Sequence, residues 1–328
     1  MSHKNKQKTF FISSIIFLLL GCTQKPVDIV SPTQPNIILE TPIPNRNPTP
    51  TITSQPQVAQ EDTGYEGYYT GIVVITEYYT LLNNELLEEA YERLSISEQN
   101  ENSLKEFIQL NEGVTSEIVT IKPLVIWQIE QGISPFIKDK EGRIGFVVEL
   151  FNSQRGKHAL FFSLVKESEN WKIDVISENL ITVMFETSTT PILDIGSVPD
   201  RSYYDSIVTI AKFHVLFNYS LYKNAHQLLS SFRRNPQNLD EFISDIQTFG
   251  IVKRQIISIR PFYEGTLQLQ TFTTPVPSVR RMFYAELYVE GKGGWAGSVP
   301  NGLYGYYITT IFEQDKWKIY SVNTVGLP

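Results

Sequence analysis

The sequence predicts an α+β protein with two tandem domains, each with N-terminal helices packed on a curved antiparallel sheet. Three observations predict this fold class. Residues 72–95 and 207–230 align without a gap and are identical at nine of 24 positions. Apolar residues at helical spacing open each repeat, and segments with strand-like alternation follow. Helices followed by several strands of period two indicate an α+β fold with an antiparallel sheet.

Residues 1–21 have the pattern of a lipoprotein signal peptide. Three lysines (Lys4, Lys6 and Lys8) precede an apolar run that is about half the length of a spanning helix. The run ends in Leu19-Leu20-Gly21-Cys22, which resembles the bacterial lipobox and contains the only cysteine of the chain. The resemblance implies that Cys22 is acylated and becomes the first residue after cleavage. An ordinary secretory signal with an incidental cysteine is the alternative.

Residues 22–64 are expected to form a tether. From Thr23 to Gly64 there is no aromatic residue, and eight of the 18 prolines of the chain lie there. Such a segment buries too little apolar surface to offset the entropy cost of ordering, and proline keeps it extended. A semi-stiff spacer is therefore the prediction, with a proline-rich partner motif as the alternative.

The first repeat is expected to occupy residues 65–186 and the second residues 203–328, with a connector at 187–202. Apolar positions 75, 79, 82, 86, 90 and 94 lie on one face of a helix, and His214 replaces Tyr79 on that face. Capping-box patterns at Ser103–Glu106 and Asn238–Glu241 predict a second helix in each repeat. Gly113 and Gly250 stand where a left-handed residue ends that helix.

Three pairs of segments predict equivalent strands. Residues 117–123 match 255–261, residues 146–151 match 283–288, and residues 170–176 match 316–322. The offset between copies grows from 137 to 146 between the last two pairs, so the second copy carries an insertion near 290–305. The simplest explanation of these matches is a duplication.

The repeat resembles the nuclear-transport-factor-2-like family, which includes the ketosteroid-isomerase-like and SnoaL-like proteins. The resemblance is carried by the amphipathic first helix, the short capped second helix and the Trp-Lys-Ile motifs at 171–173 and 317–319. It implies two cone-shaped domains whose helices close over a bent sheet to leave a pocket. Some members are isomerases or cyclases.

The composition and motifs favour no particular chemistry. The net charge is −7, or −10 without residues 1–21, so neither a nucleic-acid partner nor attraction to anionic headgroups is predicted. No histidine pair has metal-ligand spacing, and we expect no metal and no cofactor. The phase of the second copy puts Glu286, and by equivalence Glu149, on the exposed face of a strand. No catalytic residue is assigned.

The remaining candidate ligand contacts are one histidine and several aromatic residues of the second repeat. His214 lies on the apolar helix face, where it is either a pocket residue or a core histidine. Aromatic rings with polar tips suit contacts with glycans or proteins, although core packing explains many of them equally well. The candidates are His214, Tyr263, Tyr284, Trp295 and Tyr304.

From the sequence we expect a lipid-anchored protein on the extracytoplasmic face of a cell membrane or outer membrane. Its duplicated domains would act as a non-catalytic binding or scaffold module for an envelope protein or a glycan. An isomerase- or cyclase-type enzyme that uses one pocket is the first alternative, and an accessory domain pair for cell-wall machinery is the second. A buried acid or histidine lining a closed pocket would favour the enzyme.

Overall fold

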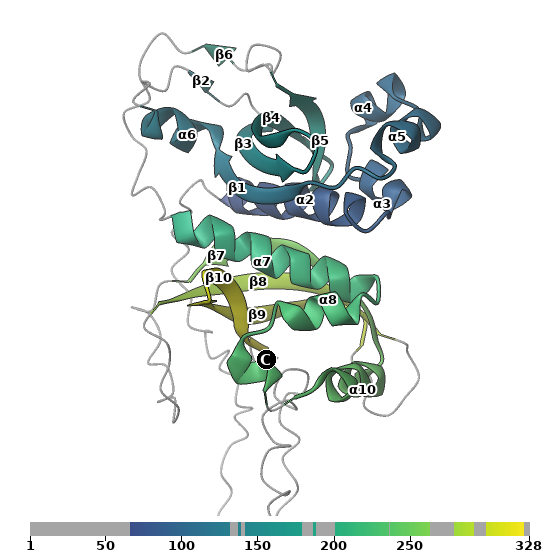
Figure 1. Ribbon diagram of the computed structural model, residues 1–328, viewed down its shortest axis with the longest axis vertical. Helices are drawn as coiled ribbons and strands as arrows, with labels where there is room; N and C mark the ends of the chain where they lie inside the picture. The colour runs from purple at the N-terminus through teal and green to yellow at the C-terminus, as the bar shows by residue number, and fades with distance from the viewer. Residues whose placement is uncertain are drawn as a thin grey trace, which may run out of the picture.

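The computed structural model describes residues 66–131, 137–138, 142–178, 186–187, 201–235, 237–262, 279–291 and 300–324. These residues form two units, each with helices packed against a four-stranded antiparallel sheet (Figure 1). The α+β fold class with two tandem units is therefore confirmed. Residues 1–65, on which the predictions of a signal peptide and a tether fall, lie outside the described residues.

The first unit has five helices and one large sheet within its described residues. Its helices are α2 (Glu66–Leu82), α3 (Leu87–Tyr91), α4 (Ile96–Glu101), α5 (Leu104–Asn111) and α6 (Leu124–Glu130). Its sheet has the order β1-β3-β4-β5, with β1 (Glu117–Pro123), β3 (Arg143–Asn152), β4 (Gly156–Glu167) and β5 (Asn170–Ser177). Two short strands, β2 (Ile137–Lys138) and β6 (Glu186–Thr187), pair separately.

The second unit repeats this arrangement. Its helices are α7 (Arg201–Asn218), α8 (Tyr222–Gln227), α9 (Ser231–Arg234) and α10 (Leu239–Phe249). Its sheet has the order β7-β8-β9-β10, with β7 (Ile251–Pro261), β8 (Arg280–Gly291), β9 (Gly302–Glu313) and β10 (Lys316–Thr324). The expected insertion falls in the connection between β8 and β9, where residues 292–299 lie outside the described residues.

Both sheets bend at equivalent places. The ladder shifts register between Ile118 and Thr120 in β1 and between Ile256 and Ser258 in β7. It shifts again opposite β4 in β5, around Asp174, and opposite β9 in β10, around Tyr320. A β-bulge bends its strand and increases the local twist, so each sheet curves around the helices in the same way.

The first helix of each unit is shorter than the apolar spacing predicts. The spacing extends to Leu94, but α2 ends at Leu82 and α3 starts at Leu87. Glu85 has a φ of 59°, and the Leu86 amide donates to the Leu81 carbonyl at 3.0 Å, which together form a Schellman end. The second unit breaks in the same way at Ser220. The apolar face continues across the break because α3 packs back against α2.

The predicted caps are present. Ser103 and Glu106 form a capping box at α5, and Asn238 and Glu241 form one at α10. Gly250 follows α10 in the left-handed conformation with a φ of 60°, and Gly113 follows α5 with a φ of 71°. These local signals fix where the second helix of each repeat begins and ends.

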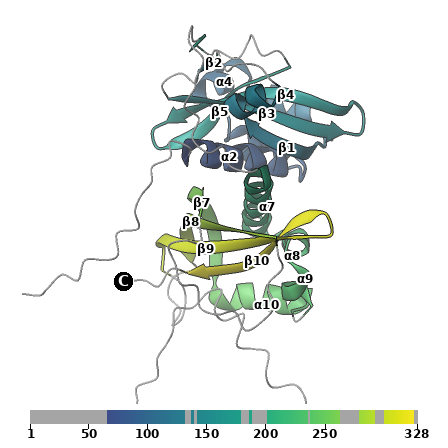
Figure 2. The same cartoon turned by 90° about the vertical axis from the view of Figure 1, so that its left-hand side faces the viewer.

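The two units meet through their first helices. Helices α2 and α7 lie side by side between the two sheets (Figures 1 and 2), and α2 also contacts β7 while α7 contacts β1. Burial raises the pKa of Glu77 on α2. Arg93 of the same unit opposes that shift, and so does Lys253 of β7 in the other unit. At the equivalent position of α7, burial lowers the pKa of Lys212, and Glu117 of β1 opposes that shift. The contact is therefore reciprocal, with opposite charges facing each other across it.

Within the described part of the chain, none of the helices is both long enough and apolar enough to cross a membrane.

Candidate functional site

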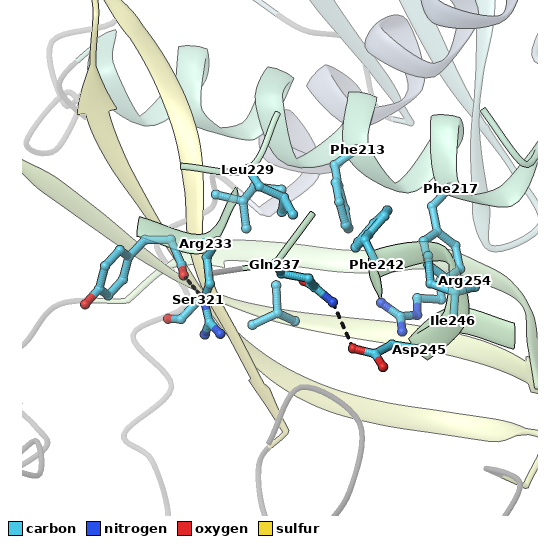
Figure 3. A pocket seen from close by; sticks show the side chains of 13 residues that line it. Phe213, Phe217, Leu229, Arg233, Gln237, Phe242, Asp245, Ile246, Arg254 and Ser321 are labelled. Carbon is cyan, nitrogen blue, oxygen red and sulfur yellow. Dashed lines mark hydrogen bonds between the residues drawn. The ribbon is translucent and has the colours of Figure 1, made fainter. Parts of the chain in front are cut away.

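The second unit contains a cavity of about 50 Å³ between α7, α10 and β10 (Figure 3). About 10–15 Å³ of such space holds one water molecule, so the cavity has room for a small ligand group. Its lining consists of Phe213, Phe217, Leu229, Arg233, Gln237, Phe242, Asp245, Ile246, Arg254, Ile319, Tyr320, Ser321 and Val322.

The walls of the cavity are mostly apolar because α7 and α10 each direct an apolar face into it. Phe213 and Phe217 lie one turn apart on α7, and Phe242 and Ile246 lie one turn apart on α10. Ile319 of β10 closes the opposite side and is buried. All five of these residues belong to the apolar core, so the cavity is a gap in the core of the second unit.

Three polar side chains of the lining, those of Arg233, Gln237 and Asp245, make hydrogen bonds. The Gln237 amide Nε2 donates to Asp245 Oδ2 at 2.8 Å, and Arg233 Nε donates to the Tyr320 carbonyl at 2.6 Å (Figure 3). Arg233, Asp245 and Tyr320 keep part of their surface in solvent, so the cavity is reached from their side. Burial raises the pKa of Asp245, and the Gln237 hydrogen bond opposes this shift.

Arg254 is the buried cation of the lining. Its side chain is 4% exposed, and its guanidinium lies over the Phe217 ring, 4.5 Å from the ring centroid. The residues that the structure describes give this guanidinium no hydrogen bond and no ion pair, and its Nε is buried. Burial lowers the Arg254 pKa, but an arginine stays charged in proteins. The cavity therefore has a positive wall.

An asparagine on α7 fixes the backbone of Arg254. Asn218 Nδ2 donates to the Arg254 carbonyl at 2.7 Å, and the Arg254 amide donates to Asn218 Oδ1 at 2.8 Å. Asn83 holds Ser116 of the first unit in the same way, with both distances at 2.8 Å. We call each pair an asparagine clamp. The clamps place a serine in one unit where the other has an arginine.

The equivalent region of the first unit is occupied by aromatic rings. Tyr78 and Tyr79 take the positions of Phe213 and His214, and Phe107 takes that of Phe242. The Tyr78 ring contacts Tyr79 and Phe107, with centroid distances of 5.2 and 6.4 Å. Tyr91 adds a further contact with Phe107 at 5.4 Å. The second unit has Phe213, His214 and Phe242 at these positions, so it lacks the hydroxyl groups of Tyr78 and Tyr79.

His214 lies beside the cavity without lining it. It is 1% exposed, and its ring meets Phe213 at a centroid distance of 5.5 Å. Neither ring nitrogen has a hydrogen-bond partner among the described residues. Burial lowers the His214 pKa to about 3, with a smaller effect from the positive charge of Arg254. The ring is therefore neutral at pH 7.

Two other predicted ligand contacts, Tyr284 and Tyr304, are described and do not line the cavity. Tyr284 lies on the outer face of the second sheet, where it contacts Tyr307 at 5.8 Å and carries Arg260 5.2 Å above its ring. Tyr304 donates its hydroxyl to the Pro300 carbonyl at 2.8 Å. Tyr263, Trp295 and Cys22, the predicted lipidation residue, lie outside the described residues.

The two repeated glutamates are engaged on the outer faces of their sheets. Glu149 pairs with Lys157 at 2.7 Å, and Glu286 accepts a hydrogen bond from the Ser258 hydroxyl at 3.2 Å. Across the described ranges, no group of three or more histidine, cysteine or acidic side chains could hold a metal ion.

Sequence reasoning missed Arg233, Gln237, Asp245 and Arg254. The strand alignment begins at Glu117 and Gln255, one residue after the positions that matter most. The signal was present, because Asn83 and Asn218 are identical residues of the aligned helices. Reading one residue further back pairs Ser116 with Arg254, and an arginine opposite a serine marks where the copies diverge in chemistry.

The comparisons with known proteins assign this chain to no family. No protein-family model matches the sequence, and no curated protein matches it. Among solved structures, the chain is similar to an "Ntf2 like protein involved in plasmid conjugation", with 11% sequence identity and a TM-score of 0.21. The match covers 80% of this chain and 96% of that chain. At this TM-score the likeness carries no argument about fold or function.

Proposed function

We propose that this protein is a lipid-anchored extracytoplasmic lipoprotein of the nuclear-transport-factor-2-like type, and that it acts as a non-catalytic binding module. The cavity of the second unit is the observation that carries the binding role. A gap of this size in an otherwise packed core costs stability, because its lining loses packing partners. Such a cavity, with apolar walls and polar groups at its edge, suits a small ligand.

The binding role is tested by ligand-detected NMR on the full-length protein. We expect signals from small neutral organic compounds whose first few carbons enter the cavity. Ile246→Phe fills the cavity from α10 and should abolish them. Val252→Phe adds the same ring to a half-exposed surface residue of β7 and serves as the matched control. Equal signals in both variants would contradict binding in the cavity.

The anchoring role rests on the lipobox-like sequence that ends at Cys22, followed by the proline-rich segment to Gly64. Cys22→Ala removes the thiol that acylation needs, so membrane retention should be lost. Labelling with a palmitate analogue, followed by fractionation, measures both effects. If the wild-type protein takes up no label and Cys22→Ala still sediments with membranes, the anchor is not a lipid on Cys22.

A small-molecule isomerase is the second candidate function. The position of Asp245 at the edge of the cavity favours it. A half-buried acid with a raised pKa at the edge of a cavity has the character of a general base. Such an enzyme would exchange carbon-bound protons of its ligand with solvent. Exchange in D₂O that Asp245→Asn stops would support catalysis, and binding without exchange supports the non-catalytic module.

A further inference from the structure

The unpaired charge of Arg254 is the feature that the proposed binding role does not yet explain. Arginine is almost never fully buried unless it is paired, because the desolvation of a charge costs several kcal/mol even after relaxation. Arg254 is buried, and its contact with Phe217 is a cation–π contact that leaves the charge uncompensated. An anion that enters the cavity would complete the pair.

The charged neighbours of the cavity do not supply that anion. Asp245 is the one carboxylate of the lining, and its Oδ2 accepts the Gln237 amide at 2.8 Å. The electrostatic interactions that shift the Asp245 pKa involve Gln237 and Glu241, and Arg254 is not among them. The second cation, Arg233, donates to the Tyr320 carbonyl and lies closer to solvent.

The fold itself does not require an arginine at this position. The asparagine clamp of the first unit holds Ser116 with the same two backbone hydrogen bonds. The clamp therefore forms with a short side chain, although Ser116 directly precedes β1 and Arg254 lies inside β7, which begins at Ile251. The arginine adds a buried charge to a position that folds without one, so the needs of the fold do not account for it.

We propose that the cavity of the second unit binds the carboxylate group of a small apolar acid, with Arg254 as its counter-ion. This inference rests on the proposed binding role and names the chemical class of the ligand. The guanidinium presents a planar fork of donors that matches a carboxylate. Phe213, Phe217 and Phe242 provide the apolar surface for the carbon atoms next to it.

The size of the cavity sets the shape of the ligand. About 50 Å³ accommodates the carboxylate and the first few carbons. A longer chain would leave past Arg233, Asp245 and Tyr320, where the lining meets solvent. Asp245 at this edge repels a second negative charge when it is ionised, so a monocarboxylate fits better than a dicarboxylate.

The experiment is calorimetric titration of the full-length protein with acetate, butyrate and hexanoate, with hexan-1-ol and hexylamine as matched probes. We expect hexanoate to bind about 10- to 100-fold more tightly than hexan-1-ol, the range of a charge-assisted hydrogen bond. Arg254→Met keeps most of the volume and removes the charge, so it should bind the two equally. Ser116→Ala changes the equivalent position of the first unit and should leave the preference intact.

A second measurement separates a binding role from a structural one. Removing an unpaired buried charge relieves its desolvation cost, so the ligand-free Arg254→Met protein should have a higher Tm than the wild type. Hexanoate should raise the Tm of the wild type and leave that of Arg254→Met unchanged. A lower Tm in Arg254→Met, together with an unchanged preference for hexanoate, would make Arg254 a structural residue and overturn the inference.

The remaining outcomes are distinguishable. If the wild type binds hexanoate and hexan-1-ol equally, the carboxylate inference fails and the binding role stands. If the wild type binds neither compound and Ile246→Phe gives the same NMR signals as the wild type, both the carboxylate inference and the binding role fail. If Arg233→Gln loses as much hexanoate affinity as Arg254→Met, Arg254 is not the specific counter-ion and the inference fails. If inorganic phosphate competes with hexanoate, the site binds anions in general and the inference of an apolar acid fails.

Discussion

Tyr69 and Tyr204 occupy equivalent positions in the two repeats, and their rings pack against each other at a centroid distance of 6.4 Å. A residue that meets its own counterpart lies on or near a two-fold axis. Both rings are buried, so the contact belongs to the common core of the two units. The two copies of the repeat therefore meet as the two halves of a symmetric pair.

Tyr69→Ala and Tyr204→Ala should each lower the free energy of unfolding by about 3–5 kcal/mol, because each removes a buried aromatic ring. The double variant should lose less than the sum by about 0.5–1.5 kcal/mol, since the ring pair is lost only once. Urea denaturation of the four proteins gives the coupling. Tyr69→Ala combined with Asn238→Ala, a cap residue of α10, should be additive. A fully additive tyrosine pair would contradict direct packing.

His214 should make the protein sensitive to acid. Its pKa is about 3 in the folded state and about 6.5 in the unfolded chain. Between these values the unfolded chain binds a proton that the folded protein does not bind. Stability is therefore lost as the pH falls from 6.5 towards 3, by about 1.4 kcal/mol per pH unit and at most ~5 kcal/mol.

His214→Leu should remove this loss. The variant and the wild type are compared by urea denaturation between pH 7 and pH 4. The stability of His214→Leu relative to wild type should rise steadily as the pH falls. Parallel curves over this range would show that folding does not lower the His214 pKa.

The asparagine clamps offer a matched pair of variants. Asn83→Ala and Asn218→Ala each leave a backbone amide and a carbonyl without their partner, which costs about 1–3 kcal/mol for each buried group. Both should lower stability by a similar amount. Asn218→Ala should also weaken hexanoate binding because it releases the backbone of Arg254, whereas Asn83→Ala should not. Equal effects on binding would mean that Asn218 does not position Arg254.

The two motif tryptophans should differ in their contribution to stability. Trp317 is 8% exposed and packs against Phe312, so Trp317→Ala should cost about 3–5 kcal/mol. Trp171 is half-buried, so Trp171→Ala should cost less. Denaturation monitored by circular dichroism measures both. A larger loss in Trp171→Ala would contradict the difference in burial.

Most of the fold could be predicted because its signals are local. Alternating strands such as 117–123 and the capping boxes at Ser103 and Asn238 are written in short stretches of sequence. The break after α2 could not be predicted, because Glu85 adopts a positive φ without being a glycine. Nothing in the residue type marks that conformation.

The candidate site could be predicted only in part, because burial of a polar residue is a property of the tertiary structure. Arg254 lies on an edge strand, where an arginine is usually in solvent. It is buried because the adjoining α7 covers that end of the strand and Asn218 holds it there. The sequence singles out His214 because it interrupts an apolar helix face. Whether its ring lines the cavity depends on how α7 is rotated against the sheet, which the sequence does not show.

The reciprocal packing of α2 and α7 has a consequence for how the two units can change. In a homodimer of identical chains, a substitution such as serine to arginine appears in both subunits, and its cost is incurred twice. Here both halves belong to one polypeptide, so each position mutates alone. The ring-filled first unit can keep its packing and support its partner through the shared core, while the second carries an open cavity and a buried charge. Fusion thus frees one half to specialise at the expense of its own stability.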